Sequence, residues 1–258
     1  MSTCCLRSTL WEGTPTGTVT TLAGAPNPVY VANPAPTSTS RAAILLIHDL
    51  LGWTFPNARL LADAYAREAD ATVYLPDFFG GEVVPFEPVL AGRFDEIDLP
   101  AWTARNNREV REPEIVAFAR ALRASGEYDK IGAIGFCFGG WAVFRLGAHE
   151  FAQEGGGKGL VDCISAGHPT WLTEKDVEEV AVPAQLLAPE LDITFTAEMK
   201  LFTFSALQKK GISFDYQHLP GVMHGCLTRG DATHKGEREA MVRGKDAAVA
   251  WFRQWLHE

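Results

Sequence analysis

Short apolar runs of five or six residues recur from residue 42 onward, with helical segments between them. A nearly continuous apolar run is typical of a strand buried on both faces. The runs are Ala42–Ile47, Ala71–Leu75, Ile131–Phe136, Leu160–Ile164 and Val182–Leu187. Such strands alternating with helices predict βαβ units. We therefore expect an α/β fold with a mostly parallel, doubly wound sheet and helices on both faces.

The segments between the runs show helical spacing. Apolar residues share one face at Leu60, Leu61, Ala64 and Tyr65, and again at Ile115, Phe118, Ala119 and Leu122. Pro113 suits the first turn of the second of these helices. The stripe Ala248, Trp251, Phe252, Trp255 and Leu256 predicts a final amphipathic helix whose apolar face joins the core.

The chain is predicted to form one domain over residues 1–258, because strands and helices alternate without a repeat or a long linker. Residues 1–40 contain the β-like runs Gly17–Leu22 and Val29–Ala32, which predict antiparallel edge strands joined by loops. Residues 78–107 are rich in Gly and Pro and predict an irregular segment. Long irregular insertions are usually lids or binding loops, although a passive surface loop is the alternative.

Charge, apolar run length and cysteine spacing argue against a nucleic-acid-binding, membrane-spanning or disulfide-rich protein. The formal charge of −9 disfavours nucleic-acid binding, and no run approaches the roughly 18 apolar residues of a membrane span. The N-terminus resembles no secretory leader, so we expect a cytoplasmic protein. The scattered, odd set Cys4, Cys5, Cys137, Cys163 and Cys226 matches neither a disulfide framework nor metal-site spacing. No metal or cofactor is expected.

Cys137 lies in a G-x-C-x-G motif, Gly135-Phe136-Cys137-Phe138-Gly139, between an expected strand and an expected helix, Trp141–His149. This is the nucleophile-elbow pattern with cysteine in place of serine. Glycines are needed because the turn is too tight for side chains at their positions. The helix N-terminus favours a thiolate and can hold an oxyanion. The alternative is a glycine-rich turn with a buried, inert cysteine.

An acid and a base follow the elbow in the chain order of α/β-hydrolases, which is nucleophile, acid, base. Asp192 comes directly after an apolar strand, with Glu190 as a rival two positions earlier. His224 lies on a glycine-flanked loop between the expected strand Ser213–Gln217 and the last helix. The sequence therefore predicts a triad of Cys137, Asp192 and His224.

The chain resembles the dienelactone hydrolase family of the α/β-hydrolase fold, especially its fungal members, from about Arg41 to the C-terminus. The matching segments are Ile47-His48-Asp49-Leu50-Leu51-Gly52, Pro56-Asn57-Ala58-Arg59, Leu75-Pro76-Asp77-Phe78-Phe79-Gly80-Gly81, Gly135 to Gly140, Gly167-His168-Pro169 and His224-Gly225. The cysteine elbow is the most discriminating of these. The resemblance implies a carboxymethylenebutenolidase-like hydrolase.

The resemblance also implies individual roles. Cys137, Asp192 and His224 would be nucleophile, acid and base, and the N–H groups of Leu50 and Phe138 would form the oxyanion hole. Asp49 would lie near the thiol, with a turn-capping carboxylate as the alternative, and Arg229 would hold a substrate carboxylate unless it is merely solvated. His168 is a further candidate for substrate binding. Cys226 replaces the aromatic residue usual after the His-Gly pair, and Arg93 and Arg105 have no secure match to the second substrate-binding arginine.

The predicted reaction is hydrolysis of a small ester or lactone through an acyl-enzyme on Cys137. Two alternatives remain: an acyltransferase, cyclase or isomerase with the same elbow, and a non-catalytic protein that binds a small ligand. The expected partner is the substrate alone, with the protein a monomer or a homodimer.

Overall fold

The computed structural model describes residues 6–151 and 159–257. Within these residues, eight strands form one sheet in the order β1-β2-β4-β3-β5-β6-β7-β8. The strands are β1 (Thr18–Leu22), β2 (Ala25–Ala32), β3 (Ala42–Ile47), β4 (Thr72–Pro76), β5 (Lys130–Phe136), β6 (Cys163–Gly167), β7 (Ala184–Leu191) and β8 (Phe214–Met223). β1 and β2 pair antiparallel at one edge, and the strands from β4 to β8 pair parallel. The predicted mostly parallel sheet and the antiparallel edge are confirmed.

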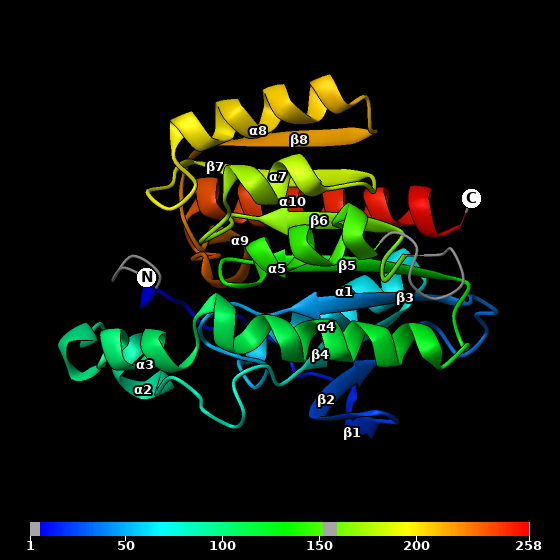
Figure 1. Cartoon of the computed structure of the whole chain (residues 1–258). Coiled ribbons are helices and arrows are strands. Elements are labelled where there is room, and N and C mark those ends of the chain that lie inside the picture. The colour runs from blue at the N-terminus through cyan, green and yellow to red at the C-terminus, as the bar shows by residue number, and fades with distance from the viewer. Residues whose placement is uncertain (1–5, 152–158, 258) are drawn as a thin grey trace.

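Helices cover both faces of the sheet (Figure 1). α1 (Pro56–Ala69) and α10 (Lys235–Leu256) pack on one face, and α4 (Arg108–Ala124) and α5 (Gly139–Leu146) on the other. The remaining helices are α2 (Phe86–Leu90), α3 (Leu99–Arg105), α7 (Glu174–Glu179), α8 (Ala197–Lys210) and α9 (Cys226–Arg229), with 3₁₀ turns η2 (Phe94–Glu96) and η3 (His149–Phe151). None of the described helices is long and apolar enough to cross a membrane.

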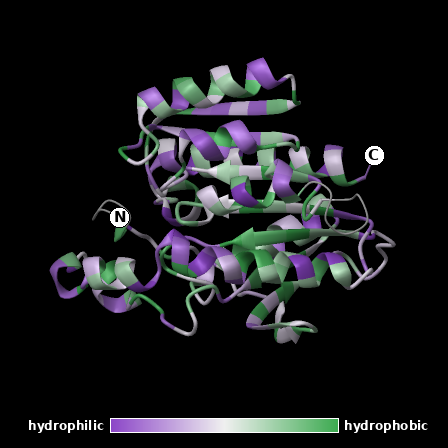
Figure 2. Ribbon diagram, in the orientation of Figure 1, coloured by the Kyte–Doolittle hydropathy of each residue, from purple (hydrophilic) through white to green (hydrophobic). Residues whose placement is uncertain are grey.

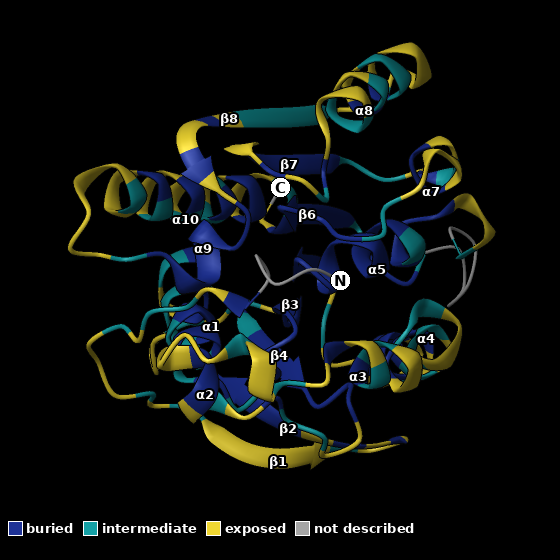
Figure 3. Ribbon diagram, turned by 90° about the vertical axis from the view of Figure 1, so that its left-hand side faces the viewer, coloured by how far each residue is buried: buried dark blue, intermediate teal, exposed yellow. Residues whose placement is uncertain are grey.

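The central strands are mostly apolar because they are buried on both sides. Along β3, Ala43, Leu45 and Ile47 join the core under α4 and α5, whereas Ile44 and Leu46 join the core under α1 and α10. Figure 2 shows the contrast, with β3 hydrophobic and α4 alternating between hydrophobic and hydrophilic turns. In Figure 3 the buried middle strands lie between exposed edges at β1 and α8. The packing of helices on both faces of the sheet holds the carboxyl ends of β3, β5, β6 and β7 together.

The strand predicted at Leu160–Ile164 is wrong by three residues, since β6 runs from Cys163 to Gly167. Leu160 and Val161 are buried, but they fill the core ahead of the strand and make no ladder. These two residues are apolar because they are buried, and their apolar character resembles that of a buried strand. β7 also extends beyond the predicted Val182–Leu187, to Leu191.

The segment 78–107, predicted to be irregular, instead forms α2, η2 and α3. Pro100 lies in the first turn of α3, where proline is tolerated, and Asp98 Oδ1 accepts the N–H of Ala101 as a cap. Prolines therefore start helices here instead of preventing them. Figure 1 shows α2 and α3 projecting beyond the carboxyl ends of the strands.

Pro113 does not open its helix as predicted. Asn107 caps α4 by accepting the N–H of Val110 at 3.0 Å, so the helix begins at Arg108 and Pro113 lies inside it. A proline within a helix removes one backbone hydrogen bond, a cost that the buried face of α4 offsets through packing.

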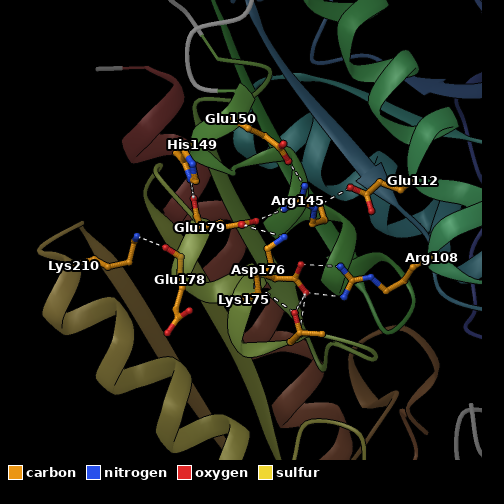
Figure 4. A network of polar contacts seen from close by, with 11 residues as sticks. Arg108, Glu112, Arg145, His149, Glu150, Lys175, Asp176, Glu178, Glu179 and Lys210 are labelled. Atoms are coloured by element: carbon orange, nitrogen blue, oxygen red, sulfur yellow. Dashed lines mark hydrogen bonds and ion pairs between the residues drawn. The ribbon is translucent and has the colours of Figure 1, made fainter.

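A network of ion pairs joins α4, α5 and α7 on the outer side of the helix layer (Figure 4). Arg145 pairs with Glu112 at 2.9 Å and Glu179 at 2.6 Å. Arg108 donates two hydrogen bonds of 2.7 Å to Asp176. This bidentate contact fixes the orientation of the guanidinium. The same Arg108 donates to the carbonyl oxygen of Trp171 at 2.7 Å, which anchors the loop after β6.

Candidate active site

Cys137 lies at the turn from β5 into α5 with a φ angle of 51°. A non-glycine residue is strained in this left-handed region, and such residues cluster at functional sites. A Cβ on Gly135 would lie 2.0 Å from the carbonyl oxygen of Gly139, and a Cβ on Gly139 would lie 2.2 Å from that of Ile47. This is the close packing that the sequence predicts for the two glycines.

Cys163 and Cys226, the other two cysteines that the structure describes, are buried like Cys137. Burial raises the pKa of Cys163 above its usual range, and burial together with the charge of Glu237 raises the pKa of Cys226 to about 12. Both side chains are therefore neutral, unreactive thiols at physiological pH. Cys4 and Cys5 lie outside the described residues.

The sulfur of Cys137 contacts a hydroxyl. Cys137 is fully buried, and its Sγ lies 3.4 Å from Thr170 Oγ1. The backbone N–H of Thr170 also donates to the carbonyl oxygen of Cys137 at 2.8 Å. The loop after β6 is therefore fixed against the elbow through both backbone and side chain.

His224 and Asp192 form a buried pair. Nδ1 of His224 lies 3.0 Å from Asp192 Oδ2 and 3.1 Å from Oδ1, and both side chains have almost no exposed surface. The rival acid Glu190 is exposed and accepts the N–H of Gly221 instead. Of the two candidate acids, only Asp192 is hydrogen-bonded to the imidazole.

The carboxylate of Asp192 is held in its charged form. Burial alone would raise the pKa of Asp192, but the hydrogen bond and charge of His224 and the N–H of Phe195 outweigh it and bring the pKa below its usual range. The N–H and hydroxyl of Thr194 each donate to Asp192 Oδ1 at 2.8 Å. A fixed carboxylate on Nδ1 directs Nε2 of His224 away from it, as a general base requires.

The two predicted oxyanion residues lie just beyond the ends of the neighbouring strands β3 and β5. Phe138 follows Cys137 directly, and Leu50 follows the end of β3 by three residues. Ile47 at the end of β3 is in register with Gly135 of β5, so the two loops leave the same edge of the sheet side by side. Both residues are fully buried.

His168 packs against His224 and has no exposed surface. Its ring is 4.8 Å from that of His224 in an edge-to-face arrangement, and its φ angle is 38°. Neither ring nitrogen has a hydrogen-bond partner among the residues that the structure describes. Burial, followed by the charges of His224 and Arg229, holds the pKa of His168 well below its usual value. The imidazole is therefore neutral.

Asp49 and Arg229 form an internal ion pair. Arg229 Nε lies 2.9 Å from Asp49 Oδ2, and the arginine side chain has no exposed surface. The hydroxyl of Thr228 donates to the same oxygen at 2.8 Å, and Oδ1 accepts the N–H of Leu51 at 2.9 Å. Asp49 therefore caps its own turn and neutralises Arg229, and Arg229 is not the solvated surface residue that was the alternative.

Three polar residues at this site were not predicted from the sequence. Thr170 contacts the sulfur of Cys137 and Thr194 contacts His224, and nothing in their local sequence marks them. Asn57, quoted above only within a matching segment, accepts the N–H of Trp11 and donates to the carbonyl oxygens of Thr9 and Thr228. It ties α1 to α9 and to the N-terminal segment.

The described part of the chain offers no group of three His, Cys, Asp or Glu side chains arranged to hold a metal ion. The polar side chains at the carboxyl edge are instead a cysteine thiol, a histidine hydrogen-bonded to a carboxylate, and a set of hydroxyl groups. This arrangement suits acyl transfer at a carbonyl carbon.

The chain is similar to known hydrolases in sequence and to solved structures in fold. Residues 28–256 match the model of the dienelactone hydrolase family. The hydrolase tropI of Talaromyces stipitatus is 28% identical over 263 residues, covering 99% of this chain and 96% of that protein. The human carboxymethylenebutenolidase homolog is 32% identical over 188 residues, covering 72% and 71%. A dienelactone hydrolase structure from Anabaena variabilis superposes with a TM-score of 0.65 at 16% identity, covering 93% and 97%.

Proposed function

The chain belongs to the dienelactone hydrolase family, and from that premise we propose that it hydrolyses an ester or lactone through an acyl-enzyme on Cys137. The observation that carries the proposal is the buried pair of Asp192 and His224 at the sheet edge where Cys137 is held at a φ angle of 51°. Nucleophile, base and orienting acid are the three groups that nucleophilic acyl transfer requires.

In the proposed reaction His224 takes the proton of the Cys137 thiol, and the sulfur attacks the substrate carbonyl carbon. The N–H groups of Phe138 and Leu50 donate to the resulting oxyanion. As the carbonyl reforms, the carbon–oxygen bond to the leaving alkoxide breaks and His224 protonates that alkoxide. His224 then takes a proton from water, which attacks the thioester and releases the acid and the thiol.

We propose that the substrate body lies under the segment 78–107. A cleft of about 460 Å³ lies between Thr103 and Asn107 on one side and Trp171 and Leu172 on the other. The ring of Trp171 packs edge-to-face on Phe138 at 6.1 Å, so the cleft is one side chain away from the proposed oxyanion hole. Arg108, Glu109 and Thr173 also line the cleft, and its apolar walls, Trp171 and Leu172, suit an apolar or aromatic group.

We propose further that the bound substrate is uncharged. Arg108 beside the cleft is occupied by both oxygens of Asp176, and Arg229 is neutralised by Asp49. The expectation that Arg229 and His168 bind substrate stays a prediction, and both residues reach a substrate only if the surrounding loops move, because neither has exposed side-chain surface.

The test compares Cys137→Ala with Cys163→Ala, which removes an equally buried thiol away from the triad. With p-nitrophenyl butyrate, Cys137→Ala should lower kcat by about 10³-fold or more, and Cys163→Ala should leave it within about twofold. His224→Ala should accumulate a butyryl group on the peptide containing Cys137, detected by mass spectrometry. Undiminished turnover by Cys137→Ala would refute the proposal.

The complete burial of Cys137 favours a second candidate, an acyltransferase that excludes water from the thioester. Adding a thiol or alcohol acceptor to the same assay separates the two. A hydrolase releases butyrate at an unchanged rate, whereas a transferase releases the butyryl product of the acceptor.

A further inference from the structure

Thr170 is fixed against the nucleophile by two independent contacts. Its N–H donates to the carbonyl oxygen of Cys137 at 2.8 Å, and its Oγ1 lies 3.4 Å from the sulfur. The preceding Pro169 packs so tightly on the start of α5 that a Cβ on Gly140 would lie 2.5 Å from its Cα. Thr170 is 2% exposed, so solvent does not compete for its hydroxyl.

Thr194 connects this hydroxyl to the acid and the base. Its Oγ1 accepts from Thr170 Oγ1 at 3.4 Å and donates to Asp192 Oδ1 at 2.8 Å. The same oxygen lies 2.9 Å from Nδ1 of His224. The two hydroxyl groups therefore link the sulfur to the Asp192 carboxylate on the Nδ1 side of the imidazole.

The direction of these bonds defines a resting state. Either atom of the contact between Cys137 Sγ and Thr170 Oγ1 can be its donor. When Thr170 donates to Thr194, and Thr194 donates to Asp192 and not to the more distant carbonyl oxygen of Pro169 at 3.3 Å, Thr170 Oγ1 accepts the thiol hydrogen of Cys137. A hydroxyl has one donor hydrogen and two acceptor lone pairs, and it rotates freely about its carbon–oxygen bond. The same group can therefore accept from a thiol and donate to a thiolate.

We propose that Thr170 is a catalytic residue whose hydroxyl accepts from the Cys137 thiol at rest and turns to donate to the thiolate, with Thr194 as its positioning residue. In this step the proton moves from Sγ to His224, and Thr170 keeps its own hydrogen throughout. No bond to carbon forms or breaks. The inference rests on the proposed function, because it assigns a role in activating the same nucleophile.

The energetic basis is that a hydrogen bond to a charged acceptor is roughly twice as strong as one between neutral groups. Turning the hydroxyl toward sulfur therefore stabilises the thiolate more than the initial contact stabilises the thiol. A difference of about tenfold in the thiolate fraction corresponds to about one pH unit in the midpoint of thiolate formation. That midpoint is measurable without any substrate.

The experiment follows the rate of iodoacetamide modification of Cys137 against pH, read by mass spectrometry, in Thr170→Val, Thr170→Ser and Thr194→Val. Thr203→Val is the matched control, because Thr203 is fully buried and its hydroxyl donates only to a helix carbonyl, that of Met199 at 2.7 Å. Each variant is also melted and assayed for kcat and KM.

We expect Thr170→Val to move the midpoint upward by about one pH unit and to lower kcat by about tenfold with KM little changed. Thr170→Ser should restore most of both values, and Thr194→Val should give a smaller upward shift. Thr203→Val should lower the melting temperature without moving the midpoint.

An unshifted midpoint in folded Thr170→Val, or a downward shift, would overturn the inference. If Thr170→Val does not fold, the test relies on Thr194→Val and Thr170→Ser. An unshifted midpoint in Thr194→Val would refute the role of Thr194 in positioning the Thr170 hydroxyl. The modification profile is independent of turnover. Active Cys137→Ala would therefore refute the proposed function, whereas an unshifted profile with inactive Cys137→Ala would refute only the role of Thr170.

Discussion

Replacing Gly139 with alanine should disable the elbow while leaving every polar group of the site in place. The added Cβ would lie 2.2 Å from the carbonyl oxygen and 2.8 Å from the carbonyl carbon of Ile47, in the central strand β3. Carbon contacts are favourable at about 3.5 Å, so α5 and β3 must separate by about 1 Å. Overpacking of a core costs typically about 1–3 kcal/mol. Because the obstacle is backbone on both sides, we expect about 3 kcal/mol.

Thermal unfolding and turnover measure the two consequences. At about 2–4 °C per kcal/mol for a chain of this size, the melting temperature should fall by about 6–12 °C. A displacement of about 1 Å at the nucleophile should lower kcat by about 100-fold. Gly236→Ala is the control, because Gly236 lies in α10 with nothing within 4 Å of the added Cβ. That variant should be unchanged or more stable, by up to about 1 kcal/mol. Normal stability and activity in Gly139→Ala would show that the elbow packs less tightly than described here.

Two further predictions concern charge. Because burial, then the charges of His224 and Arg229, hold the pKa of His168 well below its usual value, the unfolded chain alone takes up this proton below about pH 6.5. Folded stability is then fully present above that pH and falls by about 1.4 kcal/mol per pH unit below it. The variant His168→Asn keeps a residue type that tolerates the left-handed backbone conformation. Between pH 6 and 5, the free energy of unfolding measured with urea should fall by about 1.4 kcal/mol less in this variant than in the wild type. The same pH dependence in both proteins would contradict a neutral, buried His168. An uncharged aryl ester should be cleaved with about tenfold higher kcat/KM than its carboxylate analogue, because Asp49 offsets the charge of Arg229. Asp49→Asn should lower the ratio of kcat/KM for the uncharged ester to that for the carboxylate ester. If the wild type preferred the carboxylate ester, Arg229 would be available to substrates and the reasoning would be refuted.

Much of the fold followed from the sequence because the signals were local. The runs Ala42–Ile47 and Ile131–Phe136 gave two central strands within one residue of β3 and β5. Gly135 and Gly139 around Cys137 predicted the tight turn between β5 and α5, because such a turn leaves no room for side chains at these two positions. The strand at Leu160–Ile164 was misplaced because buried residues look alike whether or not they join a ladder. The segment 78–107 was misjudged because prolines in a first turn do not prevent a helix.

The site could be predicted only as far as its residues follow recognisable elements. Asp192 was a candidate because it follows an expected apolar strand, and His224 because it lies on a glycine-flanked loop after the expected strand Ser213–Gln217. In the structure β7 and β8 extend to Leu191 and Met223, so both residues directly follow parallel strands at one edge of the sheet. Thr170 was not found, because a threonine has no distinguishing sequence context until the sulfur is placed beside it. Sequence therefore identifies the groups that carry charge or react with substrate more readily than the hydroxyl groups that contact them.

Arg229 shows why the chemical state of a residue depends on distant sequence. Its neutralisation depends on Asp49, which is 180 positions away and is itself fixed by Thr228 and the N–H of Leu51. Leaving a buried arginine without its carboxylate would cost several kcal/mol, so the two residues are coupled through the fold and not through any local pattern. The same pair joins the loop after β3, where the predicted oxyanion donor Leu50 lies, to α9 beside His224. Breaking this pair should therefore change the spacing between Leu50 and His224, the proposed oxyanion donor and base, together with the charge of the site. For this reason Asp49→Asn should alter kcat as well as substrate preference.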